Sequence, residues 1–297
     1  MNRPSTDEDV GLSQRQGQRL RKWRDAIALR FFDTRYGRDL LIKAIGPRTR
    51  FMTVDCGDHL LTFSPEDYLG RSVFVKNHFD RDHVGRLMGK LAELGVDLKG
   101  TTLLEIGANI GTHTVYFGLT RTFGRILAIE PDPRNFELLD ENVLQNGFGD
   151  LVVRVPYAVS DQERTIEFFL HPNNHGKSSP NQRHVDDRKI RVAALPIPEI
   201  LARAGVPQAD VGLVWMDIEG YEPIAARSMQ PLFERRIPVH MEFTGDFYGR
   251  EKATEFVAFL ARFYDNCMVF YNDDSEEQRK VTDIPLDREQ FDILLLP

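Results

Sequence analysis

The sequence predicts an α/β fold built on a doubly wound, mostly parallel sheet, preceded by an N-terminal extension made of a helix and a hairpin. Residues 103–111 read as a strand that ends in a glycine-containing turn, and a helix opens directly after it. After this unit, strands alternate with helices of about ten residues or more, which is typical of βαβ units. Residues 211–216 form a continuous apolar run, as expected for a central parallel strand that is buried on both faces.

The chain is predicted to divide after residue 64, into the extension and a main domain of residues 65–297. Residues 1–14 are polar, so we expect them to be disordered. At the end of the extension, residues 51–54 and 59–63 resemble two short strands joined by a tight turn. This pattern predicts a hairpin.

Residues 16–32 have the periodicity of an amphipathic helix, with basic side chains around one apolar face. Residues 1–50 contain twelve Lys and Arg against six Asp and Glu. We expect this helix to cap the domain or to line a subunit contact, and weak binding to a membrane surface is the alternative. The apolar face contains Leu20, Trp23, Ile27 and Phe31.

The elements of the main domain follow from apolar periodicity and from the residues that begin and end helices. Gly95 and Gly147 are predicted helix ends, and Pro133 is a predicted helix start. Helices are predicted at 80–94, 112–120, 133–146, 197–204, 222–234 and 250–264. Strands are predicted at 103–106, 125–129, 151–159, 164–170, 211–216, 238–243, 268–271 and 291–296, with 164–170 paired to 151–159. The block from residue 65 to the glycine loop is a predicted lid over the ligand.

Composition argues against several classes of protein. The net charge is −7, which disfavours nucleic-acid binding, because affinity for phosphate backbones needs a basic surface. Cys56 and Cys267 have no neighbours at a metal-binding spacing, so neither a disulfide framework nor a structural zinc site is expected. The N-terminus lacks the apolar core of a secretory signal, and no apolar run reaches the ~18 residues of a membrane span. We therefore expect a cytoplasmic protein.

The loop after the first strand differs from a dinucleotide-binding loop in two ways. Asn109 stands where such a loop has its second glycine, between Gly107 and Gly111, and an acid, Glu105, comes shortly before the first glycine. A carboxylate beside a pyrophosphate would repel it. The pattern instead favours a cationic ligand without phosphate. S-adenosylmethionine, with its sulfonium and ammonium groups, is our first candidate.

Glu130 ends the next predicted strand, 19 residues after Gly111. Nucleotide-binding α/β proteins hold a carboxylate at this point that accepts hydrogen bonds from ribose hydroxyls. An ionised carboxylate offers only acceptors, which suits a vicinal diol. Asp132, directly before Pro133, is better suited than Glu130 to cap the following helix.

Asp217 follows the buried strand 211–216 and is a candidate general base or orienting group for an acceptor hydroxyl. Glu219 lies beside it in sequence and is a candidate for the same site. His113, at the start of the helix after the glycine loop, is a second candidate base; the alternative is that it only packs. We expect Glu222 to stabilise a helix start through its negative charge.

A divalent metal ion is considered but not favoured. Asp217, Glu219 and Glu242 offer oxygen ligands, although their spacing is not diagnostic. The loop of residues 171–187 is rich in Asn, Ser, Gly and Pro and is expected to border the acceptor site. The remaining histidines singled out are scattered without ligand spacing, and we expect them to be ordinary: His59, His83, His171, His184 and His240.

Four motifs, in order, resemble the FkbM family of S-adenosylmethionine-dependent methyltransferases. They are Leu-Glu-Ile-Gly-Ala-Asn-Ile-Gly at 104–111, Ile-Glu-Pro-Asp-Pro at 129–133, Ala-Val-Ser-Asp at 158–161 and Met-Asp-Ile-Glu-Gly-Tyr-Glu at 216–222. The resemblance covers about residues 65–245. It implies a class I methyltransferase fold with seven strands, the last antiparallel. It also implies methyl transfer to a hydroxyl of a sugar, a glycolipid or polysaccharide, or a polyketide-type acceptor.

The resemblance also implies roles for individual residues. Glu130 would hold the ribose, and Ser160 with Asp161 would contact the adenine edge. The methionine part would be held by Glu105, Gly107, Asn109 and Gly111.

Two other functions remain open at this point. A nucleotide-dependent oxidoreductase or epimerase on a similar sheet would need a glycine at position 109 and usually a Tyr/Lys pair, and neither is present. A non-catalytic protein that keeps the fold is the second alternative. The sequence identifies the acceptor only as a small-molecule, glycan or lipid-linked hydroxyl. It does not identify the oligomeric state.

Overall fold

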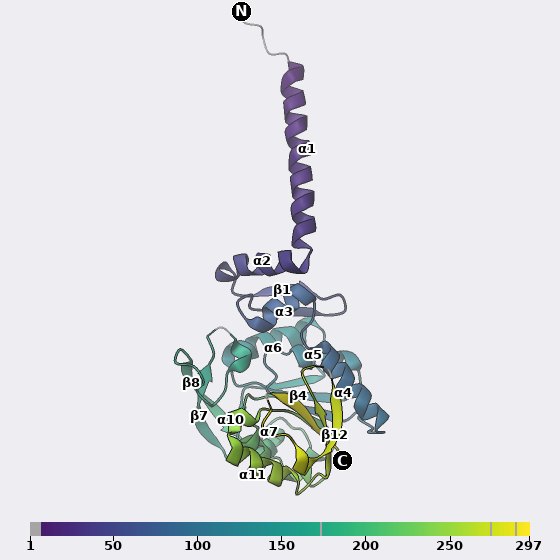
Figure 1. Ribbon diagram of the computed structural model, residues 1–297, viewed down its shortest axis with the longest axis vertical. Coiled ribbons are helices and arrows are strands. Elements are labelled where there is room, and N and C mark those ends of the chain that lie inside the picture. The colour runs from purple at the N-terminus through teal and green to yellow at the C-terminus, as the bar shows by residue number, and fades with distance from the viewer. Residues whose placement is uncertain (1–6, 173, 274, 289) are drawn as a thin grey trace, which may run out of the picture.

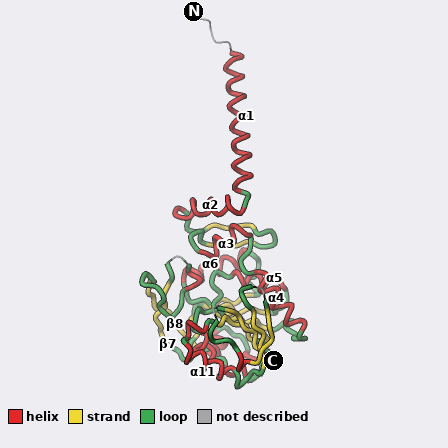
Figure 2. Tube along the Cα trace, in the orientation of Figure 1, coloured by secondary structure: helices red, strands yellow, loops and turns green. Residues whose placement is uncertain are grey.

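The computed structural model describes residues 7–172, 174–273, 275–288 and 290–297, with side chains from residue 18 onward in these ranges. An eight-stranded sheet forms the centre of the molecule, surrounded by helices (Figure 2). Its strand order is β12-β11-β13-β10-β9-β3-β4-β5. In chain order, the strands are β3 (Thr102–Ile106), β4 (Arg125–Ile129), β5 (Val152–Val155), β9 (Val211–Met216), β10 (Val239–Phe243), β11 (Asn266–Phe270), β12 (Glu276–Lys280) and β13 (Phe291–Leu295).

The sheet confirms the predicted doubly wound, mostly parallel α/β fold. Strands β5, β4, β3, β9 and β10 are parallel neighbours, whereas β13 runs antiparallel to both β10 and β11. The eighth strand, β12, adds an antiparallel edge beside β11 and is not among the seven strands that the resemblance implies. Its sequence, Glu-Glu-Gln-Arg-Lys, carries no apolar alternation, because an edge strand has little surface to bury.

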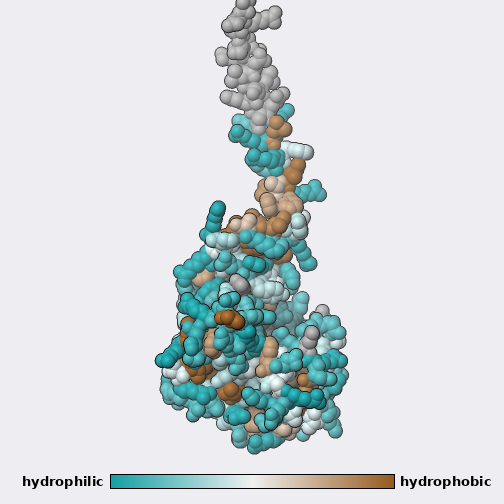
Figure 3. All heavy atoms as spheres, turned by 60° about the vertical axis from the view of Figure 1, so that its left-hand side comes forward, coloured by the Kyte–Doolittle hydropathy of each residue, from teal (hydrophilic) through white to brown (hydrophobic). Residues whose placement is uncertain are grey.

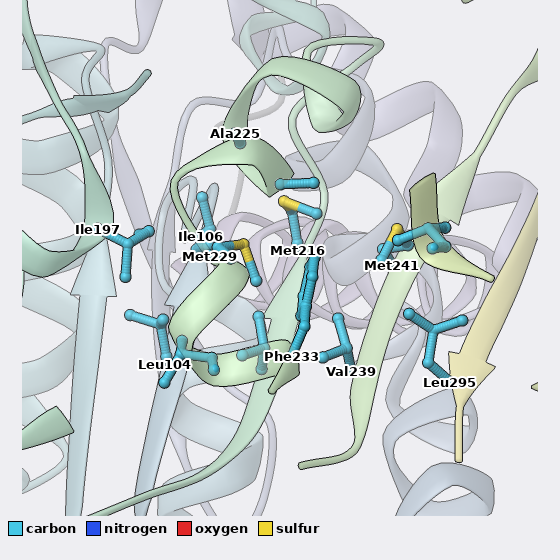
Figure 4. Close-up of a cluster of buried hydrophobic side chains, with 14 of the residues drawn as sticks. Leu104, Ile106, Ile197, Met216, Ala225, Met229, Phe233, Val239, Met241 and Leu295 are labelled. Carbon is cyan, nitrogen blue, oxygen red and sulfur yellow. The ribbon is translucent and has the colours of Figure 1, made fainter. Parts of the chain in front are cut away.

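Helices cover both faces of the sheet and create two apolar cores. Leu103 and Leu104, adjacent on β3, belong to different cores, as expected for a strand buried on both sides. Figure 4 shows the core that contains Leu104, where Met216 and Met241 of the sheet meet Phe233 of a covering helix. The described α-helices of the main domain are α3 (Tyr68–Lys76), α4 (Arg81–Glu93), α5 (Thr112–Thr120), α6 (Pro133–Gln145), α7 (Ile197–Arg203), α8 (Glu222–Arg227), α9 (Gln230–Phe233), α10 (Gly245–Tyr248) and α11 (Arg250–Leu260).

Most predicted helices lie within two residues of their observed bounds, but several elements differ. The predicted helix 222–234 is two helices, α8 and α9, and Pro231 in the first turn of α9 has no N–H to continue a single helix. Helix α11 ends at Leu260, before the predicted residue 264. A short helix that the sequence does not predict, α3 (Tyr68–Lys76), precedes α4.

The predicted strand 151–159 is wrong, because the chain leaves the main sheet after β5. Pro156, which cannot donate a ladder hydrogen bond, separates β5 from β6 (Ala158–Val159). A second sheet has the order β6-β8-β7, in which β7 (Arg164–Leu170) pairs antiparallel with β8 (Arg188–Leu195) and not with the strand predicted at 151–159. The predicted loop 171–187 connects β7 to β8.

The predicted hairpin is present as β1 (Met52–Asp55) and β2 (Leu60–Phe63), paired antiparallel. Asn142 of α6 binds the backbone of β2 as a neighbouring strand would: its Oδ1 accepts from the Thr62 N–H at 2.6 Å, and its Nδ2 donates to the Thr62 carbonyl at 2.9 Å. Leu61 and Phe63 also pack with apolar residues of α5 and α6. The hairpin is therefore fastened to the sheet domain, and the division after residue 64 stays a prediction.

The N-terminal helix α1 (Asp7–Phe32) begins earlier than predicted and projects away from the sheet domain, with α2 (Arg35–Ile45) crossing at its foot (Figure 1). The predicted disordered segment is thus helical from Asp7, and residues 1–6 lie outside the described residues. The apolar face of α1 does not cap the domain: Trp23 is 70% exposed and Leu20 68% exposed. Among the described helices, none is both long and apolar enough to cross a bilayer.

Candidate active site

A pocket lies beyond the carboxyl ends of β3, β4 and β9, where open α/β sheets bind their ligands. The second sheet and the loop between β7 and β8 contribute its far side. Six residues singled out from the sequence line it together, namely Gly107, Asn109, His113, Glu130, Asp217 and Glu219. Four others do not: Glu105, Gly111, Ser160 and Asp161.

The glycine loop is shaped by a close approach between β3 and β9. Gly107 has φ 87°, and a Cβ atom there would lie 1.9 Å from the carbonyl oxygen of Asp217. Only glycine fits this position. Asn109 has φ 53°, a left-handed conformation that asparagine tolerates better than most residues. This conformation explains how asparagine can replace the second glycine of the loop.

Glu130 is buried at the end of β4 and is held by two backbone donors. Its Oε2 accepts from the Asn109 N–H and its Oε1 from the Asp132 N–H, both at 2.8 Å. Burial and the nearby charge of Asp132 raise the pKa of Glu130 to about 8, although the two hydrogen bonds favour its ionised form. Each oxygen keeps a lone pair that can accept a further hydrogen bond. Asp132 caps α6, as the sequence predicts, by accepting from the Arg134 N–H.

Glu105 and Gly111 lie behind the pocket wall. Glu105 is buried, and its Oε2 accepts a 2.7 Å hydrogen bond from the Thr114 hydroxyl. Burial raises the pKa of Glu105 to about 7. A Cβ atom on Gly111 would lie 2.7 Å from Leu139 Cδ1, so this glycine allows the start of α5 to pack against α6. Both residues shape the loop from behind and do not line the pocket.

Ser160 and Asp161 are not brought to the pocket. The Ser160 hydroxyl accepts from Arg164 at 2.9 Å and donates to Asp161 at 3.1 Å, so the pair is engaged with the second sheet. Tyr157 and Phe168 line the pocket instead. The chain leaves the main sheet at Pro156, and this proline was the signal that residues further along would not follow the edge of the sheet.

His113 faces a carboxylate that the sequence analysis does not identify. Its Nε2 lies 3.5 Å from Oδ2 of Asp80, an ion-pair distance, and its ring packs on Trp215 with centroids 4.8 Å apart. Burial lowers the pKa of His113, but the interaction with Asp80 and the charges of Glu105 and Asp217 together more than offset this, so the pKa is raised overall. Asp80 precedes α4, 33 positions before His113. No sequence spacing connects the two residues.

Three carboxylates meet beside the pocket: Asp217, Glu219 and Glu242 have oxygen atoms within 4.8 Å of one another. Burial and the charge of Asp217 raise the pKa of Glu219 to about 8, and the same two causes raise the pKa of Glu242 well above its usual value. Burial also raises the pKa of Asp217, even though this residue opens onto the pocket. The cluster therefore favours either protons or a cationic ligand.

Glu222 has a structural role at the start of α8, through hydrogen bonds to the preceding turn; its expected effect as a negative charge at the helix start stays a prediction. It is fully buried at the start of α8, where its Oε1 accepts from the Ile218 N–H at 3.0 Å and its Oε2 from the Tyr248 hydroxyl at 2.9 Å. These contacts hold the turn that carries Glu219.

The loop between β7 and β8 reaches the same turn. The Ser179 hydroxyl donates to the Glu219 carbonyl at 3.0 Å, and Arg183 lies 3.5 Å from the Glu219 carboxylate. His175 contacts Asp132 at 2.7 Å and lines the pocket. The loop therefore borders the pocket, and its contact with an acceptor stays a prediction. On the other side, Leu69 and Phe79 line the pocket from the predicted lid block.

Comparisons with known proteins bear on this site. Residues 105–267 match the methyltransferase FkbM domain. In structure, the chain resembles an FkbM methyltransferase from Methylobacillus flagellatus at 15% identity, over 66% of this chain and 43% of that one, with TM-score 0.43. It also resembles precorrin-6y C5,15-methyltransferase from Geobacter metallireducens (13% identity, 73% and 88% of the chains, TM-score 0.41). A third similar structure is the tRNA m1G37 methyltransferase from M. jannaschii, at 13% identity over 84% of this chain and 56% of that one, with TM-score 0.40.

No curated protein matches the sequence significantly. The chain spans less than half the length of the FkbM methyltransferase of known structure. The family match extends from the end of β3 to the start of β11 and includes the glycine loop, Glu130 and Asp217. Because this match covers more than half of the chain, the protein belongs to the FkbM methyltransferase family.

Proposed function

We propose that this chain is an O-methyltransferase that moves the methyl group of S-adenosylmethionine to a hydroxyl of a sugar, a glycolipid or polysaccharide, or a polyketide-type acceptor. One observation carries the choice of cofactor. The pocket is lined by the acids Glu130, Asp217 and Glu219, and none of its described lining residues is Lys or Arg. A phosphate-bearing cofactor would be repelled by these acids when they are ionised and would meet no cationic side chain there, whereas a cationic cofactor without phosphate would favour their ionised form.

Named residues would hold the parts of this cofactor. The free lone pairs of Glu130 suit two adjacent ribose hydroxyls. The backbone from Gly107 to Asn109 would face the methionine part, and Tyr157 and Phe168 offer flat apolar surfaces for adenine. Glu105 and Gly111 would support the loop from behind. Ser160 and Asp161 have no part in this proposal, because they do not line the pocket.

The chain must also remove a proton from the acceptor hydroxyl, since S-adenosylmethionine supplies only an electrophilic methyl group. We assign this role to His113. Asp80 stands at its Nε2 and would stabilise the charged ring, which leaves Nδ1 to take the proton. Asp217 and Glu219 would orient the hydroxyl. Asp217 is the second candidate base: burial raises its pKa, which makes the ionised carboxylate a stronger proton acceptor, and Glu219 and Glu242 lie beside it.

Calorimetry with S-adenosylhomocysteine tests cofactor use directly. We expect one site per wild-type chain and no measurable binding by Glu130→Ala. Glu163→Ala is the matched control, since Glu163 is an exposed acid that pairs with Arg203 away from the pocket. Absence of binding to wild type would contradict the proposal, and binding of a dinucleotide instead would favour the oxidoreductase alternative.

Turnover is tested separately, by incubating the chain with labelled S-adenosylmethionine and an extract of the source cell. Mass analysis should find label on an oxygen of a carbohydrate, lipid-linked or polyketide-type product. Cofactor binding without any labelled product would favour the alternative in which the protein keeps the fold but not the activity.

A further inference from the structure

Two histidines that the sequence analysis expects to be ordinary meet in the core. His83 comes from α4 and His240 from β10, and their Nε2 atoms lie 2.7 Å apart. Oδ2 of Asp292, on β13, lies 3.6 Å from Nε2 of His83. One ligand atom from each of the three residues lies within 4.8 Å of the others. We propose that His83, His240 and Asp292 form a binding site for a divalent transition-metal ion, with Zn²⁺ as the best fit.

The donor set is characteristic of such ions. Imidazole nitrogen suits zinc and its neighbours in the first transition row, and two histidines with one carboxylate leave a coordination position open. Ligand bonds of about 2.0–2.1 Å in a tetrahedron place ligand atoms about 3.3 Å apart. The observed separations of 2.7 and 3.6 Å lie on either side of that value. The third separation, between His240 and Asp292, is within 4.8 Å, so closing the site around an ion needs side-chain movements but no rearrangement of the backbone elements.

The surroundings also favour a cation. His83 is 4% exposed and His240 is 2% exposed, in a core that includes Trp215 and Phe270. Among the described residues, the Nδ1 atom of His240 has no hydrogen-bond partner, so all of its polar contact is through Nε2. Two polar rings directed at each other in an apolar core need a group between them or a shared proton.

Negative charge gathers on the same side of the sheet. Asp292 pairs with Glu242 across β10 and β13, and the charges of Asp217 and Asp80 also act on it. A divalent ion would offset this repulsion. The Asp292 side chain is 31% exposed, so the open coordination position has a route to solvent.

A hydrogen-bond chain is the rival explanation. Arg86 lies 3.4 Å from Nδ1 of His83, so His83 can accept there and donate through Nε2 to His240. That arrangement needs no ion. The two explanations differ in metal binding, because a hydrogen-bond chain would not lead the purified protein to bind Zn²⁺ at these residues.

The test uses the full chain after removal of metals with a chelator. We expect wild type to bind about one Zn²⁺ per chain by calorimetry, and Co²⁺ to give a visible absorption band of nitrogen coordination. His240→Gln and His83→Gln should weaken Zn²⁺ binding at least tenfold. His59→Gln is the matched control, because His59 is also buried and lies outside the group.

Wild-type protein that binds neither ion would overturn the proposal, whether or not the variants fold, and would leave the hydrogen-bond chain as the explanation. Binding that survives in His240→Gln but is lost in Asp217→Asn would also overturn it, because the ion would then lie in the cluster of Asp217, Glu219 and Glu242. Neither readout depends on methyl transfer.

A second, independent inference concerns the N-terminal helices. Figure 3 shows apolar surface along α1 and at its junction with α2. Helical spacing places Leu20, Trp23, Ile27 and Phe31 on one face of α1. Among the described side chains of α1 and α2, eight large apolar ones are exposed: Leu20, Trp23, Ile27, Leu29, Phe31, Phe32, Tyr36 and Leu40. Four of them, Leu20, Trp23, Ile27 and Phe31, form one exposed stripe along α1, and an exposed apolar surface of this kind marks an interaction surface.

We infer that this face binds an anionic membrane surface. Arg19 and Arg30 border the apolar face on one side and Arg24 borders it on the other, an arrangement that suits anionic lipid headgroups. The same charges disfavour a second copy of α1 as the partner, because the basic borders of two copies would repel each other. The exposed face of α1 therefore supports weak membrane contact through this helix.

Sedimentation with vesicles tests this inference. Wild type should bind vesicles of phosphatidylglycerol and phosphatidylcholine at low salt, and not vesicles of phosphatidylcholine alone. Ile27→Glu should weaken binding at least tenfold. Leu29→Glu, which makes the same change on the opposite face of α1, should weaken it less than threefold. No binding by wild type, equal losses in both variants, or self-association that Ile27→Glu abolishes without vesicle binding would overturn the inference.

Discussion

The backbone N–H of Asn109 donates a 2.8 Å hydrogen bond to Oε2 of Glu130, which joins the loop after β3 to the end of β4 at one buried carboxylate. The left-handed conformation of Asn109, with φ 53°, accompanies this bond. The residue that departs from the dinucleotide pattern and the residue proposed to bind ribose therefore act as one unit. A change at either should affect the other.

Glu130→Gln should weaken binding of S-adenosylhomocysteine by 10- to 100-fold, about 1.4–2.8 kcal/mol. A glutamine amide has one acceptor oxygen, so one of the backbone donors from Asn109 and Asp132 would lose its partner. Calorimetry measures the change, with Glu163→Gln as the control. Unchanged affinity in Glu130→Gln would remove Glu130 from the proposed ribose site.

Cofactor affinity should depend on pH through the same residue. The pKa of Glu130 is raised to about 8, so the free carboxyl is largely protonated at pH 6. Ribose hydroxyls donate best to the ionised form, so affinity should rise as the pH increases from about 6 to 8 and then level off. Glu130→Gln should show a flatter profile over this range. An affinity that falls with rising pH in wild type would contradict this assignment.

Gly107→Ala should be much more damaging than Gly147→Ala. Both glycines have positive φ, which costs alanine about 1–2 kcal/mol. At Gly147 nothing lies within 4 Å of the added carbon, whereas at Gly107 the Asp217 carbonyl lies 1.9 Å away. We expect an additional loss of about 1–3 kcal/mol for Gly107→Ala in urea unfolding, together with lost cofactor binding. Equal losses of stability in Gly107→Ala and Gly147→Ala would show that the loop moves freely away from Asp217.

His113→Gln should lower the rate of methyl transfer by about 10²–10⁴-fold and remove its pH dependence in the acid range. In wild type the rate should rise with pH, because a base must be unprotonated, and Asp80 raises the pKa of His113. Asp80→Asn should therefore shift the acid limb of the rate profile to lower pH while it lowers the maximal rate. A His113→Gln profile that keeps the acid limb would instead identify Asp217 as the base.

The buried acid Glu105 should make the protein less stable as the pH rises. Its pKa is raised to about 7 in the folded state from 4.5, so the unfolded chain loses this proton first. The free energy of unfolding should fall between pH 4.5 and 7, by up to about 3 kcal/mol for this group. Urea unfolding of wild type and Glu105→Gln at pH 5 and 7.5 isolates the effect. If the free energies of unfolding of wild type and Glu105→Gln differ by the same amount at both pH values, the expectation is contradicted.

Local patterns were sufficient for much of the fold. The bounds of α5, β4 and β9 follow directly from apolar runs and from the residues at their ends. These sequence patterns failed where packing in the folded chain, and not local sequence, decides the secondary structure. The charged strand β12 has no apolar signal, and the split of 151–159 into β5 and β6 depends on which sheet each half joins.

The sequence by itself determined most of the strands and helices, the glycine loop and the acid at the end of β4, because each depends on neighbours within a few residues. The tertiary structure decided which side chains meet. It joined His113 to Asp80 and His83 to His240, and it kept Ser160 and Asp161 away from the pocket. The physical reason is that these contacts join elements far apart in the chain, and their geometry depends on sheet order and helix packing, which no sequence spacing encodes.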